Sequence, residues 1–349
     1  MIKNNKIKGN KILILSVYNG KVSLMTTNFH IAPLVFQPIL KKVIWGGDKI
    51  CKLKGIVTPE GNIGESWEIS QVPGSESVVA KGKYKNLSLT QLIDQFGHEL
   101  LGDEVVKKYG KRFPLLVKFI DANDNLSVQV HPNDELARER HGSSGKSEMW
   151  YIISTESHAK IFAGMKEEIN PELYEKKIMD DSFLDSVESY ESKKDDVYYL
   201  PAGTVHAIGS GNLLAEIQQS SDITYRIYDY NRKDADGNTR ELHTGLAKDA
   251  IDYTNTEKCH KEEFSEKDGI ISLVDCEHFS TSKIKIDSKR EFQINGDSFR
   301  IIVCTEGRIK LTSNGESVEL SAGFSALIPA YAHSYQLDGH GTVLVTKAR

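Results

Sequence analysis

The sequence predicts a mainly β protein, built as a sandwich or barrel with short helical insertions. Most of the chain consists of short apolar and β-branched runs separated by glycine, proline, asparagine and aspartate, which is typical of strands joined by turns. Strand candidates are residues 115–120, 126–130 and 149–153. A proline-to-histidine segment also occurs twice, at residues 200–206 and 328–333, and indicates that one β unit is duplicated.

Two segments have helical spacing instead. Residues 88–109 open with Ser88, which can cap a helix, and then repeat apolar side chains every three to four positions. Residues 171–189 are amphipathic, with Leu173 and Ile178 among charged side chains. We expect helices in both segments.

Composition limits the kinds of partner. The chain has 349 residues, and 44 basic against 49 acidic residues give a net charge of −5. This length allows two domains. Proteins that bind nucleic acids or anionic membranes usually have a clustered basic surface, so we expect neither as a partner. A small anionic substrate needs only a few local cations and stays possible. The four cysteines form no Cys-x-x-Cys pair, which favours reduced thiols in a cytoplasmic protein.

Four polar residues form a candidate metal site. Gln129 and His131 are two positions apart, so a strand would turn both side chains to one face. Glu148 follows the histidine by 17 residues, and His206 ends the first proline-to-histidine segment. Two imidazoles with carboxylate and amide oxygens suit Zn²⁺ or a similar divalent ion, and no cysteine takes part.

Several phrases of the chain resemble the type I mannose-6-phosphate isomerases of the cupin superfamily, in their short bacterial form. The phrases run in the same order over some two hundred residues, which makes the resemblance specific. They are Val-Ile-Trp-Gly-Gly at 43–47, Ile-Gly-Glu-Ser-Trp-Glu-Ile at 63–69, Phe-Pro-Leu-Leu-Val-Lys at 113–118, Ser-Val-Gln-Val-His-Pro at 127–132, Lys-Ser-Glu at 146–148 and Ser-Asp-Ile-Thr-Tyr-Arg at 221–226.

The resemblance implies two jelly rolls of the cupin type (double-stranded β-helices). Residues 25–256 would form the catalytic, metal-binding domain, and residues 257–349 a degenerate one. The second copy has no Gln-x-His and no Lys-x-Glu before its turn, so His333 lacks partners and we expect no metal there. Residues 1–24 precede the family-like sequence, and we expect an N-terminal extension that can be disordered.

The resemblance also implies an activity, the interconversion of mannose 6-phosphate and fructose 6-phosphate through an enediol(ate) proton transfer. One Zn²⁺ per chain, or another divalent ion, would be held by Gln129, His131, Glu148 and His206. The family's catalytic positions match Arg226, Lys146 and Glu216. Its substrate-binding positions match Lys118, Ser127, Trp45 and Glu65.

Alternatives stay open at this point. An iron-dependent cupin oxygenase usually has histidine where this chain has Gln129, and the amide favours Lewis-acid chemistry over oxygen activation. A non-catalytic phosphosugar-binding cupin would keep the pocket but would not need Lys146, Glu216 and Arg226 together. The proton-transfer base is undecided, and both a monomer and a homodimer are compatible with the sequence.

Overall fold

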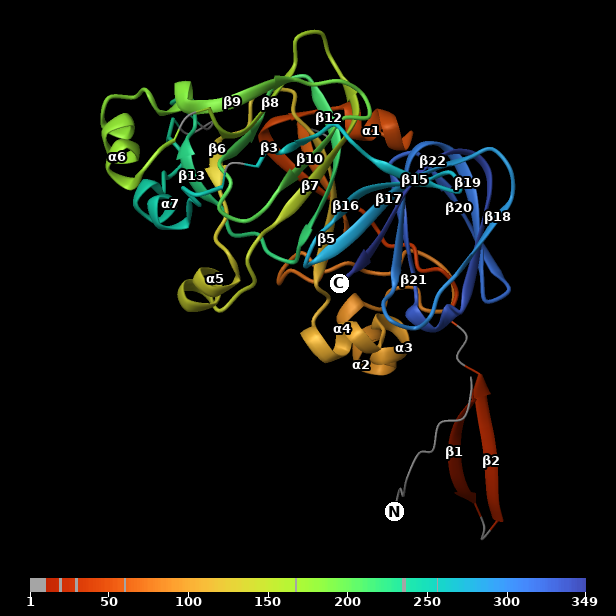
Figure 1. Ribbon diagram of the computed structural model, residues 1–349. Helices are drawn as coiled ribbons and strands as arrows, with labels where there is room; N and C mark the ends of the chain where they lie inside the picture. Colours follow the sequence, from red (N-terminus) through yellow and green to blue (C-terminus); the bar gives the residue numbers. More distant parts are fainter. Residues whose placement is uncertain are drawn as a thin grey trace.

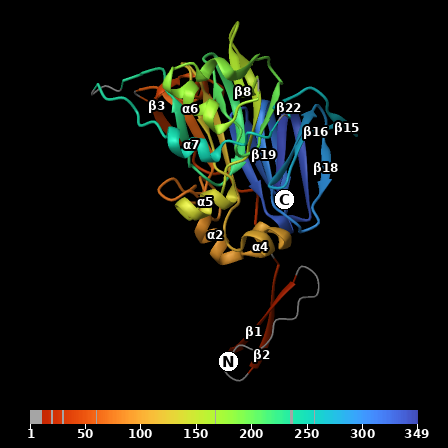
Figure 2. The same ribbon diagram turned by 60° about the vertical axis from the view of Figure 1, so that its left-hand side comes forward.

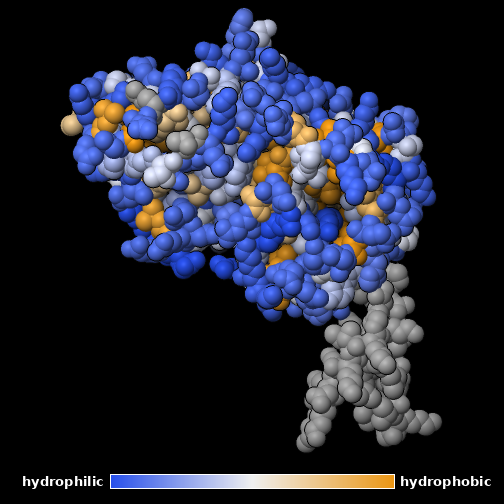
Figure 3. Space-filling view, viewed as in Figure 1, coloured by the Kyte–Doolittle hydropathy of each residue, from blue (hydrophilic) through white to orange (hydrophobic). Residues whose placement is uncertain are grey.

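The computed structural model describes residues 11–18, 21–28, 31–59, 61–166, 168–233, 237–255 and 257–349. It confirms the mainly β fold: two bodies of antiparallel sheet lie side by side, and a separate two-stranded ribbon projects away from them (Figure 1). The visible face is largely hydrophilic (Figure 3). No helix among the described residues is long and apolar enough to span a membrane.

The N-terminal jelly roll has two sheets. The larger has seven strands in the order β14-β10-β7-β12-β5-β4-β3. Their bounds are β3 (Ile39–Gly47), β4 (Ile63–Ile69), β5 (Leu115–Asp121), β7 (Glu148–Thr155), β10 (Val197–Leu200), β12 (Asn212–Gln219) and β14 (His260–Lys261). Every residue of β5 and β12 is buried, because one face covers the second jelly roll and the other lines the interior of the first.

The smaller sheet of this jelly roll has five strands in the order β13-β6-β11-β8-β9. They are β6 (Val128–Val130), β8 (Lys160–Met165), β9 (Val187–Glu191), β11 (His206–Ile208) and β13 (Tyr225–Tyr228). Because β13 is an edge strand, its outer backbone groups need partners from outside the sheet. The three strand candidates of the sequence are confirmed as β5, β6 and β7.

The C-terminal jelly roll is built on one sheet with the path β15-β16-β17-β22-β19-β20, on which β18 also pairs with β22 and β21 with β19. The strands are β15 (Ser265–Lys267), β16 (Ile270–Asp275), β17 (Phe279–Ile286), β18 (Arg290–Gln293), β19 (Arg300–Ser313), β20 (Glu316–Ser321), β21 (Phe324–Ile328) and β22 (Ser334–Ala348). The sheets of the two jelly rolls therefore divide between Lys261 and Ser265, a few residues beyond the division that we expected.

The helical segment expected over residues 88–109 consists of three separate helices. They are α2 (Leu89–Phe96), α3 (His98–Leu101) and α4 (Asp103–Tyr109), and Figures 1 and 2 both place this group below the junction of the jelly rolls. Ser88 caps α2 as expected, by accepting from the Gln91 N–H at 3.3 Å. Gly97 and Gly102 both have positive φ, and these two turns break the apolar periodicity into separate helices.

The helix expected over residues 171–189 is also shorter than its apolar pattern. α6 (Pro171–Met179) is followed by a 3₁₀ turn, η1 (Phe183–Ser186), and residues 187–189 already belong to β9. Asn170 caps α6 through its side chain. The segment is thus helical in two short pieces, and they are separated by a turn in which Asp181 takes a positive φ. Three further helices were not expected, and they are α1 (Lys49–Lys54), α5 (Asp134–His141) and α7 (Thr244–Ala250).

The N-terminal ribbon consists of β1 (Lys11–Tyr18) and β2 (Lys21–Asn28), paired antiparallel. Of the extension expected over residues 1–24, residues 1–10, 19 and 20 lie outside the described residues. Leu34 pairs through its backbone with Leu327 of β21. A segment early in the chain is therefore attached to the C-terminal jelly roll.

A buried ion pair joins the two jelly rolls. Lys54, the last residue of α1 (Lys49–Lys54), has a fully buried side chain whose Nζ lies 2.7 Å from Glu68 Oε1 and also donates to the Gly323 carbonyl of the C-terminal jelly roll. The ammonium also lies 4.5 Å from the ring centre of Phe324. Burial raises the pKa of Glu68, and Lys54 opposes that shift.

Replacing Lys54 with methionine tests this pair. The variant would leave the Glu68 charge buried without its partner, and we expect a loss of about 3–5 kcal/mol in the free energy of unfolding. Thermal unfolding of Lys54→Met, compared with Lys52→Met on the same helix, measures the effect. Lys52 pairs with Asp48 at the surface, with 71% of its side chain exposed, so its loss should cost under about 1 kcal/mol. Equal unfolding temperatures for the two variants would contradict the assignment.

Candidate functional site

A row of three residues crosses the five-stranded sheet. Gln129 on β6 lies opposite His206 on β11 and opposite Arg226 on β13. Directly opposed residues of antiparallel strands project from the same face, so the three side chains are neighbours. This face turns towards the seven-stranded sheet, and the site therefore lies in the interior of the N-terminal jelly roll.

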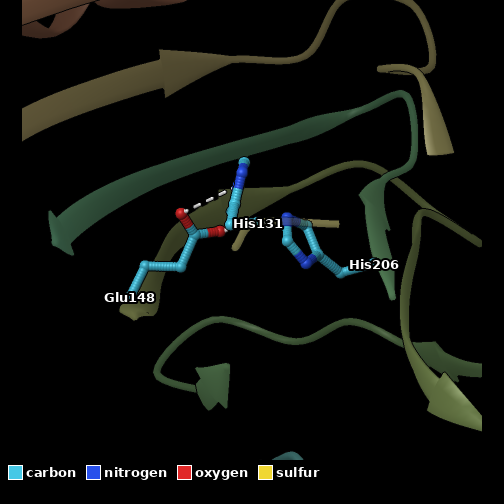
Figure 4. Close-up of side chains that lie close together, drawn as sticks. All are labelled: His131, Glu148 and His206. Atoms are coloured by element: carbon cyan, nitrogen blue, oxygen red, sulfur yellow. Dashed lines mark ion pairs between the residues drawn. The ribbon is translucent and has the colours of Figure 1, made fainter. Parts of the chain in front are cut away.

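The facing sheet contributes the carboxylate. Glu148, the first residue of β7, lies with its Oε1 3.3 Å from His206 Nε2 and its Oε2 3.5 Å from His131 Nε2 (Figure 4). The three residues are at most 1% exposed. In the described part of the chain, their nitrogen and oxygen atoms lie close enough together to hold one metal ion.

Backbone carbonyls orient both imidazole rings. His131 Nδ1 lies 2.9 Å from the Ile223 carbonyl oxygen, and His206 Nδ1 lies 2.9 Å from that of Thr204. A carbonyl can only accept, so each Nδ1 carries the hydrogen and each Nε2 presents a lone pair to the centre. Burial lowers the pKa of both rings, that of His206 to about 3, so that both are neutral at pH 7.

The buried Glu148 carboxylate lacks hydrogen bonds. Neither oxygen has a partner of hydrogen-bonding geometry, although Lys146 Nζ lies 2.7 Å from Oε2. Burial raises the pKa of Glu148 to about 7, and the charge of Lys146 opposes the shift. An unsatisfied buried carboxylate beside two imidazole lone pairs is a site that a cation would stabilise.

The donor set fits a divalent metal ion. Tetrahedral ligands about 2.1 Å from zinc lie roughly 3.4 Å apart, close to the two histidine–carboxylate distances. Gln129 Nε2 lies 3.3 Å from His206 Nε2, so the amide is already next to the centre. A half-turn of the amide exchanges its nitrogen and oxygen and would present the oxygen as a ligand.

Lys146 lies among the same groups. Its Nζ is 2.8 Å from His131 Nε2 and 2.7 Å from Glu148 Oε2, and the residue is 5% exposed. Lys146 is therefore buried, and its catalytic role stays a prediction. Its ammonium group therefore contacts two of the three candidate ligands.

A second row of charges crosses the seven-stranded sheet beside the first group. Trp150, Glu216 and Lys118 are opposed on β7, β12 and β5. Glu216 accepts from Trp150 Nε1 at 2.8 Å and pairs with Lys118 Nζ at 3.1 Å. Burial alone would raise the pKa of Glu216, but Lys118 and Lys146 overcome it and hold this pKa at about 2. Glu216 is therefore ionised at neutral pH.

Glu65 extends this second row. Its Oε2 lies 3.7 Å from Lys118 Nζ and accepts from Trp67 Nε1 at 2.5 Å. Two carboxylates thus share the Lys118 ammonium and raise its pKa, although burial opposes this shift. The resemblance placed Lys118 near a sugar phosphate, but its charge is already compensated by Glu216 and Glu65.

The side chain of Arg226 is held by a neighbouring loop. Its Nη1 donates to the Glu241 carbonyl at 2.8 Å, and its Nε is buried without a partner. Burial lowers the pKa of Arg226 from its ordinary value, and the nearby Arg240 acts in the same direction. The unpartnered Nε–H is free to donate to a ligand.

The remaining predicted residues lie at the margins. Ser127 is 4% exposed and directly precedes β6, two positions before Gln129. Trp45 is 4% exposed and packs in an apolar cluster that includes Trp150 and Leu126. Trp45 is thus part of the wall behind the site, and no polar contact links it to the candidate ligands in the described part of the chain.

Sequence reasoning missed two residues of this interior. The Trp150 ring meets the His206 ring edge-on, with ring centres 5.3 Å apart, and its Nε1 holds Glu216. Gln218 is fully buried opposite Glu148, and its Oε1 has no hydrogen-bond partner. Each lies two positions beyond a predicted residue on the same strand, so the two-residue period of strands was the signal that could have found them.

Comparisons with known proteins agree with this architecture. A family model described as the phosphomannose isomerase type I catalytic domain matches residues 34–151, and one for the mannose-6-phosphate isomerase cupin domain matches residues 269–348. Mannose-6-phosphate isomerase ManA of Bacillus subtilis is 35% identical over 90% of this chain and 98% of its own. The mannose-6-phosphate isomerase of Streptococcus mutans is 35% identical over 88% of this chain and 95% of its own.

Solved structures give the same result. A crystal structure of the Bacillus subtilis mannose 6-phosphate isomerase superposes with a TM-score of 0.81 at 34% identity, covering 90% of this chain and 99% of that one. A phosphomannose isomerase variant from Salmonella typhimurium has a TM-score of 0.74 at 15% identity, covering 91% and 100%, and shows the shared fold.

Metal content tests the candidate site. We expect close to one divalent ion per chain in purified protein, measured by elemental analysis. His206→Ala should weaken metal binding by more than about 100-fold, because even the loss of a group that only orients a ligand costs about 10–100-fold.

The matched control is His333→Ala. His333 ends the corresponding turn of the C-terminal jelly roll, where its side chain is exposed, so its loss should leave the metal content unchanged. Equal metal loss from both variants would show that the C-terminal jelly roll helps to build the site.

Proposed function

The chain belongs to the type I phosphomannose isomerase family, and on that premise we propose that it interconverts mannose 6-phosphate and fructose 6-phosphate. The observation that supports this most strongly is the buried His131–Glu148–His206 group, whose carboxylate oxygens lack hydrogen bonds and whose imidazole lone pairs converge. An aldose–ketose exchange moves a proton between C1 and C2, and it needs a base and stabilisation of the enediolate oxygen.

We propose that Gln129, His131, Glu148 and His206 hold one Zn²⁺ ion per chain. The fit rests on two neutral imidazoles, one carboxylate and one amide, a set without sulfur. Zinc bound there would act as a Lewis acid towards the sugar carbonyl and its neighbouring hydroxyl.

For the proton transfer we favour Lys146. Its Nζ already contacts two of the candidate ligands, so a sugar held at that centre would lie within its reach. Glu216 is the weaker candidate, because a carboxylate with a pKa of about 2 attracts protons poorly at neutral pH. Its role would be to orient Trp150 and to balance Lys118.

Arg226 would stabilise negative charge on the reacting oxygens. A guanidinium stays protonated and so cannot be the base, but its unpartnered Nε–H lies on the same face as Gln129 and can donate to an oxyanion. Lys118, Ser127, Glu65 and Trp45 stay predictions as contacts of the sugar phosphate. Since Lys118 is shared by two carboxylates, we expect it to contact sugar hydroxyls more than phosphate.

Two broader predictions accompany this function. The free cysteines and the metabolic substrate favour a cytoplasmic enzyme with a small-molecule phosphosugar as its partner. The alternatives of an oxygenase and of a non-catalytic binding protein would both retain metal or ligand binding without isomerase turnover. A direct assay of isomerase activity therefore separates the isomerase from both alternatives.

Turnover should depend on the metal. We expect measurable conversion of mannose 6-phosphate in an assay that couples fructose 6-phosphate to a chromogenic reaction. Chelator-stripped protein should lose this activity, and one equivalent of Zn²⁺ should restore it. If zinc-loaded protein bound mannose 6-phosphate but did not convert it, the isomerase function would be wrong and the binding-protein alternative would be favoured.

The Arg226→Lys variant should have a reduced turnover rate. Lysine keeps a positive charge but loses the planar fork of donors. The loss of one charge-stabilising donor typically costs about 10²–10³-fold in turnover, and we expect a reduction of that order at unchanged zinc content. Steady-state kinetics with mannose 6-phosphate measure it, and near-normal turnover of Arg226→Ala would remove this residue from the mechanism.

A further inference from the structure

Arg226 sits where the sheet itself gives it little support. β13 is the edge of the five-stranded sheet, so only β6 pairs with it. The pairing is irregular immediately beyond Arg226, where the register shifts between Arg226 and Tyr228. A bulge changes the direction in which the side chains of an edge strand point, and an edge strand is held by one neighbour only. A residue on such a strand that must keep a fixed position therefore needs contacts from outside the sheet.

One residue, His243, supplies that support to both backbone groups of Arg226. The His243 N–H donates to the Arg226 carbonyl at 2.7 Å, and the Arg226 N–H donates to His243 Nδ1 at 3.2 Å. Both backbone groups of Arg226 therefore point away from β6, which makes Arg226 and Gln129 a non-hydrogen-bonded pair. In such pairs the side chains come closest, so this clamp also sets the approach of Arg226 to Gln129.

The position of His243 breaks a local rule. It is the N-cap residue of α7, where serine, threonine, aspartate or asparagine is favoured, yet its side chain makes no capping hydrogen bond. The ring nitrogen is instead used on Arg226. The adjoining chain holds the guanidinium as well, because the Glu241 carbonyl accepts from Arg226 Nη1 at 2.8 Å. Departures from local preference tend to mark functional positions.

We propose that His243 is a positioning residue for Arg226, which through this clamp places the guanidinium at the reacting oxygens. The inference rests on the proposed isomerase function for its kinetic consequences. The clamp itself is independent of that function, because its two hydrogen bonds join groups of the chain alone. A shift of about 1 Å in a catalytic group can cost about 10²-fold in rate, so the loss of the clamp should reduce kcat rather than raise KM.

The test compares His243→Leu with His243→Asn. Leucine keeps a branched side chain but offers no acceptor, whereas the asparagine oxygen can take the place of Nδ1. We expect kcat of the leucine variant to fall about tenfold or more, with KM and zinc content near those of the unmodified enzyme, and the asparagine variant to recover most of the loss. Equal losses in both variants, or a leucine variant within twofold of the unmodified enzyme, would overturn the proposal.

Two further measurements separate positioning from a general loss of stability. In an Arg226→Lys background, His243→Leu should cost less than about twofold in kcat, because residues that act as a unit are not additive; an undiminished cost would overturn the proposal. The control Asn170→Ala removes the side-chain cap of α6, a neighbouring helix, without touching Arg226, and should leave kcat unchanged.

Amide hydrogen exchange gives a readout that does not depend on the reaction. The Arg226 amide should exchange faster in His243→Leu than in the unmodified protein or in Asn170→Ala, and equal protection in all three would overturn the proposal. If the unmodified enzyme showed no turnover, the isomerase function would fail while this exchange experiment still tested the clamp.

Discussion

The arrangement of this site depends on one electrostatic constraint: Glu148 is buried between two sheets without a hydrogen bond to either carboxylate oxygen. Such a charge must be met by a cation or a proton, because water is excluded. The surroundings supply both kinds of partner. Two imidazoles are held neutral with their lone pairs inward, and the Lys146 ammonium lies 2.7 Å away. Lys146 meets part of this charge at Oε2, whereas Oε1 faces His206 without a hydrogen bond.

The two sheets divide the chemistry between them. The five-stranded sheet provides neutral ligands and Arg226, whereas the seven-stranded sheet provides a row of fixed charges, Lys118 and Glu216, tied to the first group by Trp150. Trp150 contacts both His206 and Glu216, so a displacement of one of these two residues would also shift the other. Each row is built from directly opposed residues, so the register of the strands sets the spacing within each row, whereas His131 and Lys146 lie just outside β6 and β7.

The sequence singled out the candidate ligands but few of the residues that support them. Gln129, His131, Glu148 and His206 could be found because the strand period and the family phrases are local signals. Two helical stretches were too long, because the apolar spacing of residues 88–109 continues through Gly97 and Gly102, whose positive φ values break the helix. His243 could not be assigned, because its importance arises from its hydrogen bonds to Arg226 on another segment of the chain. The pairing of Lys118 with two carboxylates also depends on which strands are neighbours, which no local pattern gives.

The order of strands in the C-terminal jelly roll has a consequence for biosynthesis. β22 follows every other strand of that sheet along the chain, yet it lies within the sheet and pairs with β17, β18 and β19. Its Leu344 and Ala348 also enter an apolar cluster with Ile50 and Phe113 of the N-terminal jelly roll. Protein domains usually fold in order as the ribosome delivers them. Here the nascent N-terminal jelly roll would keep an uncovered apolar face until β22 emerges, and during that interval it would be a natural client for chaperones.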